Sequence, residues 1–132
     1  MGFIGFFYCF GSRFVACDES SAHIRFKKKV IKAQDGDTFL TLKELAPVRL
    51  LKNKFSDELL ALYKTNPSKQ ELLNLLGRAR AKKGMFEGDL EDGELEIGQI
   101  SGLINEIKPA ADIVNEMIVE FELEKFKIRN LL

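Results

Sequence analysis

The chain has 132 residues, of which 20 are basic and 20 acidic, so its formal net charge at pH 7 is zero. This length is typical of one domain, and 45% hydrophobic residues are enough for a core. A neutral balance provides no global field for nucleic acid or an anionic membrane, so neither is expected as a partner. Residues 1–10 are apolar but lack a positively charged start and are too short to span a bilayer, which predicts a cytoplasmic protein. Cys9 and Cys17 lack the spacing of a CxxC or zinc site, and reduced thiols are expected.

The first elements are expected to be a strand and a turn. The bulky run from Phe3 to Phe10 predicts a buried strand, and residues 11–14 (Gly-Ser-Arg-Phe) predict the turn after it. A strand, small residues and a helix in this order can cradle a phosphate, because glycine lets the backbone approach and N–H groups face the anion. The same pattern is also typical of an ordinary turn, which is the commoner case.

A helix is predicted from Ser20 or Ser21, as the capping residue, to about Ala33. Residues 27–29 are three lysines that we expect on its solvated face and near its C-terminus, where they complement the helix dipole. His23, the only histidine, lies near the helix start, where a capping or surface role is commoner than a role as base or ligand. The expected buried face is Ala22, Phe26 and Val30.

The middle of the chain alternates breaks with short elements. Residues 35–37 (Asp-Gly-Asp) end the helix, and residues 38–41 are expected to be extended. Residues 48–51 fit a strand or a helix equally well. Ser56 is expected to cap the next helix, which residues 66–67 (Asn-Pro) end.

Ser68 and Glu71 form an S-x-x-E capping box, which predicts a helix over residues 69–83 that Gly84 ends. A glycine-rich, acidic stretch follows, and we expect its carboxylates to be solvated because they lack the EF-hand pattern. Residues 98–103 are predicted to form a helix with small residues placed for close packing. Pro109 is predicted at the first position of the last helix, whose apolar face is Ile113, Val114, Met117, Ile118 and Phe121.

Four motifs, in order between residues 11 and 117, resemble one enzyme family. Residues 11–14 and 19–23 are similar to the G-[TS]-R-F…E-S-x-A-H segment of FMN-dependent nitronate monooxygenases. Residues 49–55 match the family's R-x-x-x-N-x-[FY], and residues 87–103 match its E-G-D…G…G-Q-x-[AS]-G-L. Flavin-containing enoyl-acyl-carrier-protein reductases belong to the same family.

The resemblance implies an α/β TIM barrel with a helical addition, in which the flavin phosphate lies on loops after the last two strands. Residues 1–34 would then be the last barrel strand, phosphate turn and last barrel helix, and residues 35–132 the helical C-terminal region. Gly11 and Ser12 would bind the FMN phosphate through their N–H groups and the Ser12 hydroxyl. His23 does not match the family's catalytic histidine, and Cys9 replaces its usual glutamine. No catalytic residue or metal ligand is therefore expected here.

One strand cannot close a barrel, so the resemblance predicts a mainly α chain that is the C-terminal portion of such an enzyme, through truncation, frameshift or an alternative start. The implied function is FMN-dependent oxidation of a nitronate, a small-molecule substrate, by flavin and oxygen, with this chain incomplete as a catalyst. The alternatives are a fragment of a flavin-dependent enoyl-acyl-carrier-protein reductase and a non-catalytic helical interaction module. In the last case, the apolar helix faces at 72–76 and 113–121 would bind a partner or self-associate.

Overall fold

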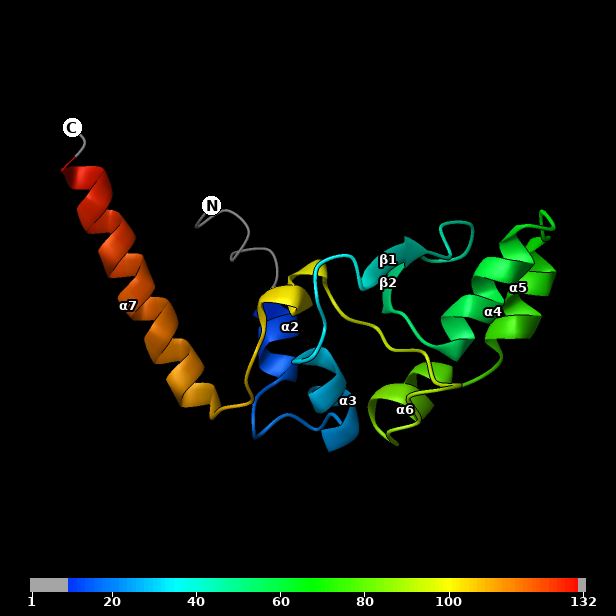
Figure 1. Cartoon of the computed structure of the whole chain (residues 1–132), viewed down its shortest axis with the longest axis horizontal. Coiled ribbons are helices and arrows are strands. Elements are labelled where there is room, and N and C mark those ends of the chain that lie inside the picture. Colours follow the sequence, from blue (N-terminus) through cyan, green and yellow to red (C-terminus); the bar gives the residue numbers. More distant parts are fainter. Residues whose placement is uncertain (1–9, 131–132) are drawn as a thin grey trace.

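The computed structural model describes residues 10–130, and the placement of residues 1–9 and 131–132 is not described. Helices and one small sheet make up this part of the chain (Figure 1). The prediction of a mainly α chain is confirmed there. In order, the elements are α2 (Phe10–Val15), α3 (Ile24–Val30), β1 (Thr38–Thr41), β2 (Val48–Leu51), α4 (Lys54–Tyr63), α5 (Lys69–Leu76), α6 (Arg80–Met85), the 3₁₀ helix η1 (Gln99–Leu103) and α7 (Ala110–Arg129).

The start of the described chain differs from the prediction. The expected turn at residues 11–14 is wrong, because these residues lie inside α2. Most of the expected strand 3–10 lies outside the described residues, and its last residue, Phe10, begins the helix. Glycine and serine are weak helix formers, but the Ser12 hydroxyl accepts a hydrogen bond from the Gly98 N–H at 2.9 Å. This hydrogen bond ties α2 to the residue before η1 and stabilises the helix. Helix propensities of single residues do not include such contacts between distant segments.

Helix α3 is shorter than predicted and begins after His23 rather than after a serine. The His23 Nδ1 accepts a hydrogen bond from the Arg25 N–H at 3.2 Å, so the predicted capping role is confirmed. Ser20 instead accepts from the Ala22 N–H in the turn before the helix. Of the expected buried face, Phe26 and Val30 are fully buried, whereas Ala22 lies before the helix and is half-buried.

The hairpin of β1 and β2 is antiparallel, with Thr38 opposite Leu51 and Thr41 opposite Val48. The undecided stretch 48–51 is therefore a strand. Residues 95–97 run along the other side of β2, where the Leu51 N–H donates to the Leu95 carbonyl at 2.9 Å. The sheet thus connects the middle of the chain to the segment before η1.

Two helix predictions need correction. Asn53, not Ser56, is the N-cap of α4, and Ser56 lies three residues later in a capping box with it. The predicted helix 69–83 begins with the expected capping box, but Gly77 ends it with φ of +67°. A second helix, α6, then contains Gly84, which was expected to end the first.

The buried hydrophobic residues form two clusters. The first joins α2 and α3 to β2 and the segment before α7, and consists of Ala16, Phe26, Val30, Leu51, Leu95, Ile97 and Ile104. The second lies between the hairpin, α4 and α5, and consists of Leu42, Leu50, Phe55, Leu59 and Leu72. Because β2 contributes to both clusters, the hairpin holds the two halves of the molecule together.

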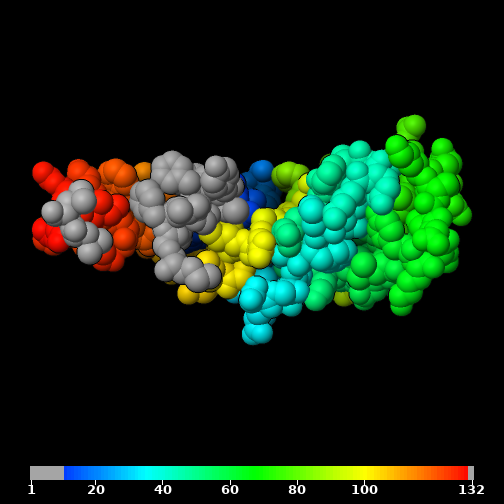
Figure 2. Space-filling model, turned by 90° about the horizontal axis from the view of Figure 1, so that it is seen from above, coloured from blue at the N-terminus to red at the C-terminus, as the bar shows by residue number. Residues whose placement is uncertain are grey.

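Helix α7 extends away from the rest of the molecule, at the opposite end from α4 and α5 (Figures 1 and 2). Pro109 is its N-cap rather than its first residue, and the helix continues to Arg129. Ile113 is buried, but several large apolar side chains are exposed: Val114, Ile118, Val119, Phe121, Leu123, Phe126 and Ile128. Between residues 10 and 130, no helix has the length and apolar character needed to cross a membrane.

Candidate functional site

The candidate phosphate-binding residues lie in the first turn of α2. Gly11 and Ser12 are the second and third described residues of α2. N–H groups in the first turn of a helix have no intrahelical acceptor, which is why such a position can hold an anion. Gly11 is exposed, and among the described residues no atom outside its chain neighbours and its own helix backbone lies within 4 Å of the position that a Cβ would occupy. The Ser12 side chain is buried, and its oxygen accepts from the Gly98 N–H, which leaves the hydroxyl hydrogen to donate elsewhere. These groups fit one side of a phosphate.

Arg13, which follows these two residues, does not add a cation to the site. Its guanidinium donates to the Ala16 carbonyl at 3.4 Å and to the Glu106 carbonyl at 3.2 Å. It therefore fixes the end of α2 to the segment before α7. The arginine of the Gly-Ser-Arg-Phe motif thus has a structural role in this chain.

A hollow of about 200 Å³ lies between η1, the segment before α7 and α7 itself. Its cations already have partners: Lys108 pairs with Glu106 at 2.5 Å and with Glu116, and Arg13 donates to backbone carbonyls. Both carboxylates raise the pKa of Lys108 through hydrogen bonds. A phosphate in this hollow would have to displace these contacts, so the start of α2 is the better candidate.

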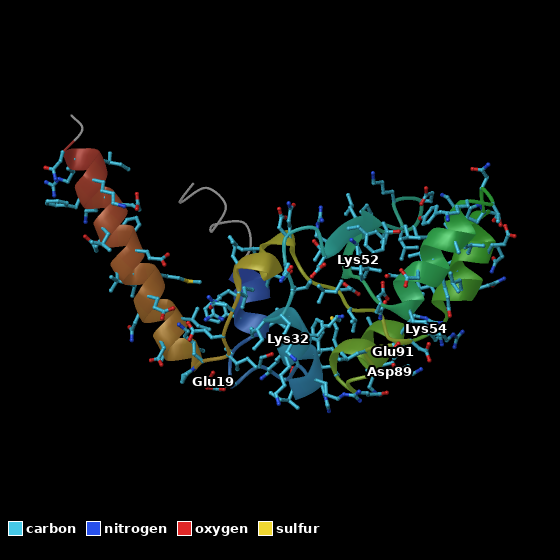
Figure 3. All side chains as sticks on the ribbon, viewed as in Figure 1. Glu19, Lys32, Lys52, Lys54, Asp89 and Glu91 are labelled. Carbon is cyan, nitrogen blue, oxygen red and sulfur yellow. The ribbon has the colours of Figure 1, made fainter. Side chains whose placement is uncertain are left out.

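The motif at residues 19–23 joins two helices and a loop. Glu19 accepts a hydrogen bond from the Ala110 N–H at 2.8 Å, so its carboxylate lies at the start of α7 (Figure 3). That hydrogen bond is the main reason why the pKa of Glu19 is lowered. Four residues later, His23 caps α3 and lies against Gly88, where a Cβ would come within 2.3 Å of the imidazole Nδ1. The motif therefore fixes α7, α3 and the loop after α6.

Lys27 is buried, which contradicts the prediction that residues 27–29 are all solvated. Its ammonium donates to the Cys17 carbonyl at 2.6 Å and to the Asp18 carbonyl at 3.2 Å. A buried lysine needs such acceptors, because an unpaired buried charge is strongly unfavourable. Lys27 therefore holds the turn between α2 and α3, and the Cys17 thiol is also buried there.

Asn53, from the third motif, connects α4 to the fourth motif. Its amide nitrogen donates to the Leu90 carbonyl at 3.0 Å and to the Gly93 carbonyl at 2.7 Å. The space around Gly93 is also restricted, since an added Cβ would lie 2.2 Å from the Gly84 Cα. The glycine at residue 93 is therefore required by the close approach of two backbone segments.

The acidic stretch is only partly solvated, as Glu94 shows. Its side chain is buried, and this burial, with a smaller effect of Glu96, raises its pKa to about 7. Asp89 is the opposite case, because its contact with Lys83 lowers its pKa to about 2. In the part of the chain that the structure describes, no cluster of three or more histidine, cysteine or acidic side chains could hold a metal ion.

The nitronate monooxygenase family model matches residues 8–120, which is most of the chain. The chain belongs to the nitronate monooxygenase family. Two solved structures of FabK from Thermotoga maritima are similar to it. One has 34% identity and a TM-score of 0.79, and the other, a methionine-to-alanine mutant, has 33% and 0.73. A search of the curated proteins gave no match.

Both FabK structures cover 92% of this chain, but the chain covers only 38% and 36% of them. It therefore spans little more than a third of a family member with a TIM barrel. Four short motifs in the sequence had predicted both this family and that the chain is only a part of such an enzyme. They did not predict that the motif residues mainly bind one another, because partners such as Ser12 and Gly98 lie far apart in the sequence.

Proposed function

We propose that this chain is the C-terminal portion of an FMN-dependent oxidoreductase, in which Gly11 and Ser12 bind the phosphate of the cofactor. The family match over residues 8–120 carries this proposal. The open approach to Gly11 and the hydrogen-bonded Ser12 hydroxyl support it. The division into a barrel remnant at 1–34 and a helical region at 35–132 stays a prediction.

In this proposal, the chain positions the cofactor and does not carry out the reaction. The flavin, when bound, supplies the electron transfer, and protein groups hold and orient it. The N–H groups of Gly11 and Ser12 would donate to phosphate oxygens. The Gly98 N–H would keep the Ser12 oxygen in place, so that its hydrogen points away from η1. The described residues offer no catalytic base that matches the family.

Two reactions are candidates for the complete enzyme. The first is the oxidation of a nitronate by flavin and oxygen, which is the reaction that names the family. The second is the reduction of an enoyl thioester by a nicotinamide cofactor. It is favoured by the likeness to FabK, a flavin-dependent enoyl-acyl-carrier-protein reductase of the same family.

Cytoplasmic location and self-association are further parts of the proposal. Seven exposed apolar side chains of α7 support association, because such a surface is unfavourable in water. Helix α7 would then pack against a second copy or against the remainder of the barrel. This surface alone also fits a non-catalytic interaction module, but the family match favours the flavoenzyme.

A chimera tests the proposal. The matching segment of Thermotoga maritima FabK is replaced by this chain, and the purified protein is examined for bound FMN. We expect a yellow protein with one FMN for each chain. Oxygen consumption with a nitronate, or nicotinamide oxidation with an enoyl thioester, then separates the two reactions. A folded chimera that stays colourless with added FMN would contradict the proposal.

A further inference from the structure

Helix α7 presents a large apolar surface to solvent. Of its 20 residues, only Ile113 is buried. Seven of its large apolar side chains are between 44% and 67% exposed: Val114, Ile118, Val119, Phe121, Leu123, Phe126 and Ile128. We call these seven residues the α7 surface. Figure 1 shows α7 extending away from the rest of the chain, and a large exposed apolar patch of this kind marks a site where another molecule packs.

The family match ends at residue 120, inside α7. Four members of the α7 surface follow that residue: Phe121, Leu123, Phe126 and Ile128. The match therefore leaves open what covers the second half of the helix. The order of the charges along α7 favours one partner.

Positive and negative charges occupy different parts of α7. Before residue 121 all of its charges are acidic: Asp112, Glu116 and Glu120. Its cations all lie in the last two turns: Lys125, Lys127 and Arg129. Two of these cations pair with glutamates of the same helix, but in residues 10–130 no ion pair involves Asp112, Glu120 or Arg129. Charges at both ends of the helix are therefore available to a partner with the reverse order of charges.

A second copy of α7 has that reverse order when the two helices run antiparallel. The basic last turns of each copy then lie beside the acidic first half of the other, and the two helix dipoles oppose each other. A parallel pair would instead place cations beside cations and carboxylates beside carboxylates, which is unfavourable. Helix α7 is about 30 Å long and extends from one end of the molecule, so an antiparallel pair keeps the rest of each copy at opposite ends (Figure 2).

Other partners match α7 less well. An anionic membrane attracts amphipathic helices whose polar side is basic, whereas acidic residues outnumber basic ones in α7. The same excess of carboxylates disfavours nucleic acid. Homodimer interfaces are more apolar than those of transient complexes, and they use one surface twice. A second copy is thus the partner that fits both the apolar side chains and the charges.

We infer that the α7 surface is the interface of a homodimer in which the two α7 helices pack antiparallel. The apolar side chains form the centre of this interface, and the opposite charges meet at its two ends. The two ends are equivalent, because two-fold symmetry repeats every contact. This inference deepens the self-association in the proposed function and rests on that part alone. Gly11 and Ser12 lie outside α7, so dimerisation and cofactor binding can be tested separately.

Sedimentation velocity of the full-length chain over a range of concentrations measures the Kd of the dimer. The apolar variant carries Ile118→Ser and Phe126→Ser. Its control carries Leu60→Ser and Leu73→Ser, which remove exposed apolar side chains from α4 and α5. We expect the Kd to rise about tenfold or more in the apolar variant and to change little in the control. Circular dichroism checks that all variants are folded.

Charge reversal tests the direction of pairing. The basic-end variant carries Lys127→Glu and Arg129→Glu, and the acidic-half variant carries Asp112→Lys and Glu120→Lys. In an antiparallel pair, each variant alone has like charges at both ends, so each Kd should rise about threefold or more. An equimolar mixture of the two variants should restore the dimer, because each end then joins opposite charges. In a parallel pair, each reversal only exchanges one contact of like charges for another, so neither variant alone would weaken the dimer.

Four results would overturn the inference: a chain that stays monomeric at every concentration, equal losses in the apolar variant and its control, charge-reversed variants that dimerise like the wild type, or a monomer that binds anionic vesicles. The assay contains no flavin. A monomeric chain therefore leaves the FMN proposal intact, and a colourless chimera leaves the dimer intact.

Discussion

Replacing Asn53 tests whether the family motifs hold the fold together. Its side-chain oxygen caps α4 by accepting from the Ser56 N–H at 3.0 Å. Its side-chain nitrogen donates to the carbonyls of Leu90 and Gly93, in a loop about forty residues further along. One side chain therefore serves as a helix cap and as a connection between distant segments.

The two roles contribute separable amounts of stability. Loss of an N-cap costs about 1 kcal/mol, and each hydrogen bond lost from a partly buried carbonyl costs about 1 kcal/mol. Asn53→Ala removes all three contacts, so we expect the free energy of unfolding to fall by about 3 kcal/mol. Asn53→Ser keeps a capping oxygen but is too short to reach Leu90 and Gly93, and should lose about 2 kcal/mol. Urea denaturation followed by circular dichroism measures both values.

Asn74 provides the matched control, because its side chain bonds only Gln70 on the exposed surface of α5. Asn74→Ala should change the free energy of unfolding by less than about 0.5 kcal/mol. The reasoning is refuted if Asn53→Ser is as stable as the wild type, because the bonds to the Leu90 and Gly93 carbonyls would then contribute nothing.

Three further predictions concern residues 93, 94 and 19, whose contacts also join distant segments of the chain. Gly93→Ala should destabilise the chain by about 3 kcal/mol in urea denaturation, because its Cβ would lie 2.2 Å from the Gly84 Cα. The buried Glu94 has a pKa of about 7 against 4.5 when unfolded, so the folded state binds its proton more tightly. Stability should therefore fall as the pH rises from about 4.5 to 7, and Glu94→Gln should be more stable by about 3 kcal/mol at pH 8 but not at pH 4.5. Glu19→Ala removes the acceptor of the Ala110 N–H, so amide hydrogen exchange should become faster in the first turns of α7 and stay unchanged in α4.

Each of these has its own control and contrary result. Gly11→Ala should be neutral or stabilising, since in residues 10–130 no atom beyond its neighbours and its own helix lies within 4 Å of its Cβ position. An equal loss there would contradict the packing argument for Gly93. Exposed Glu120 is the control for Glu94, and parallel pH profiles of the wild type and Glu94→Gln would contradict the raised pKa. Unchanged exchange in α7 would show that Glu19 does not hold that helix.

Short sequence patterns correctly predicted those elements that depend on interactions between neighbouring residues. The capping box of Ser68 and Glu71 and the buried face of α3 were predictable, because they depend on residues within one or two helical turns. The extended stretch 38–41 was also correct. By contrast, the strand at 48–51 depends on pairing with residues 38–41 and 95–97, which no short window of sequence contains.

The errors have a common physical cause, which is contact between distant segments. Ser12 lies in a helix, and Lys27 is buried, because residues elsewhere supply their hydrogen bonds. Glu94 is in an acidic loop whose composition predicts solvation, yet the packing of residues 84–97 buries it. For the candidate site, the motifs identified the family, but they did not show that Arg13 and Glu19 fix helices.

The central claim is that Ser12 binds the phosphate of FMN, and comparing FMN with riboflavin tests it most directly. Riboflavin lacks the phosphate, so the two dissociation constants of the FabK chimera isolate the phosphate contacts. We predict that Ser12→Ala weakens FMN binding about tenfold or more, that riboflavin binding hardly changes, and that Ser12→Thr restores FMN binding. Equal weakening of both ligands, or no weakening of FMN binding, would contradict the claim.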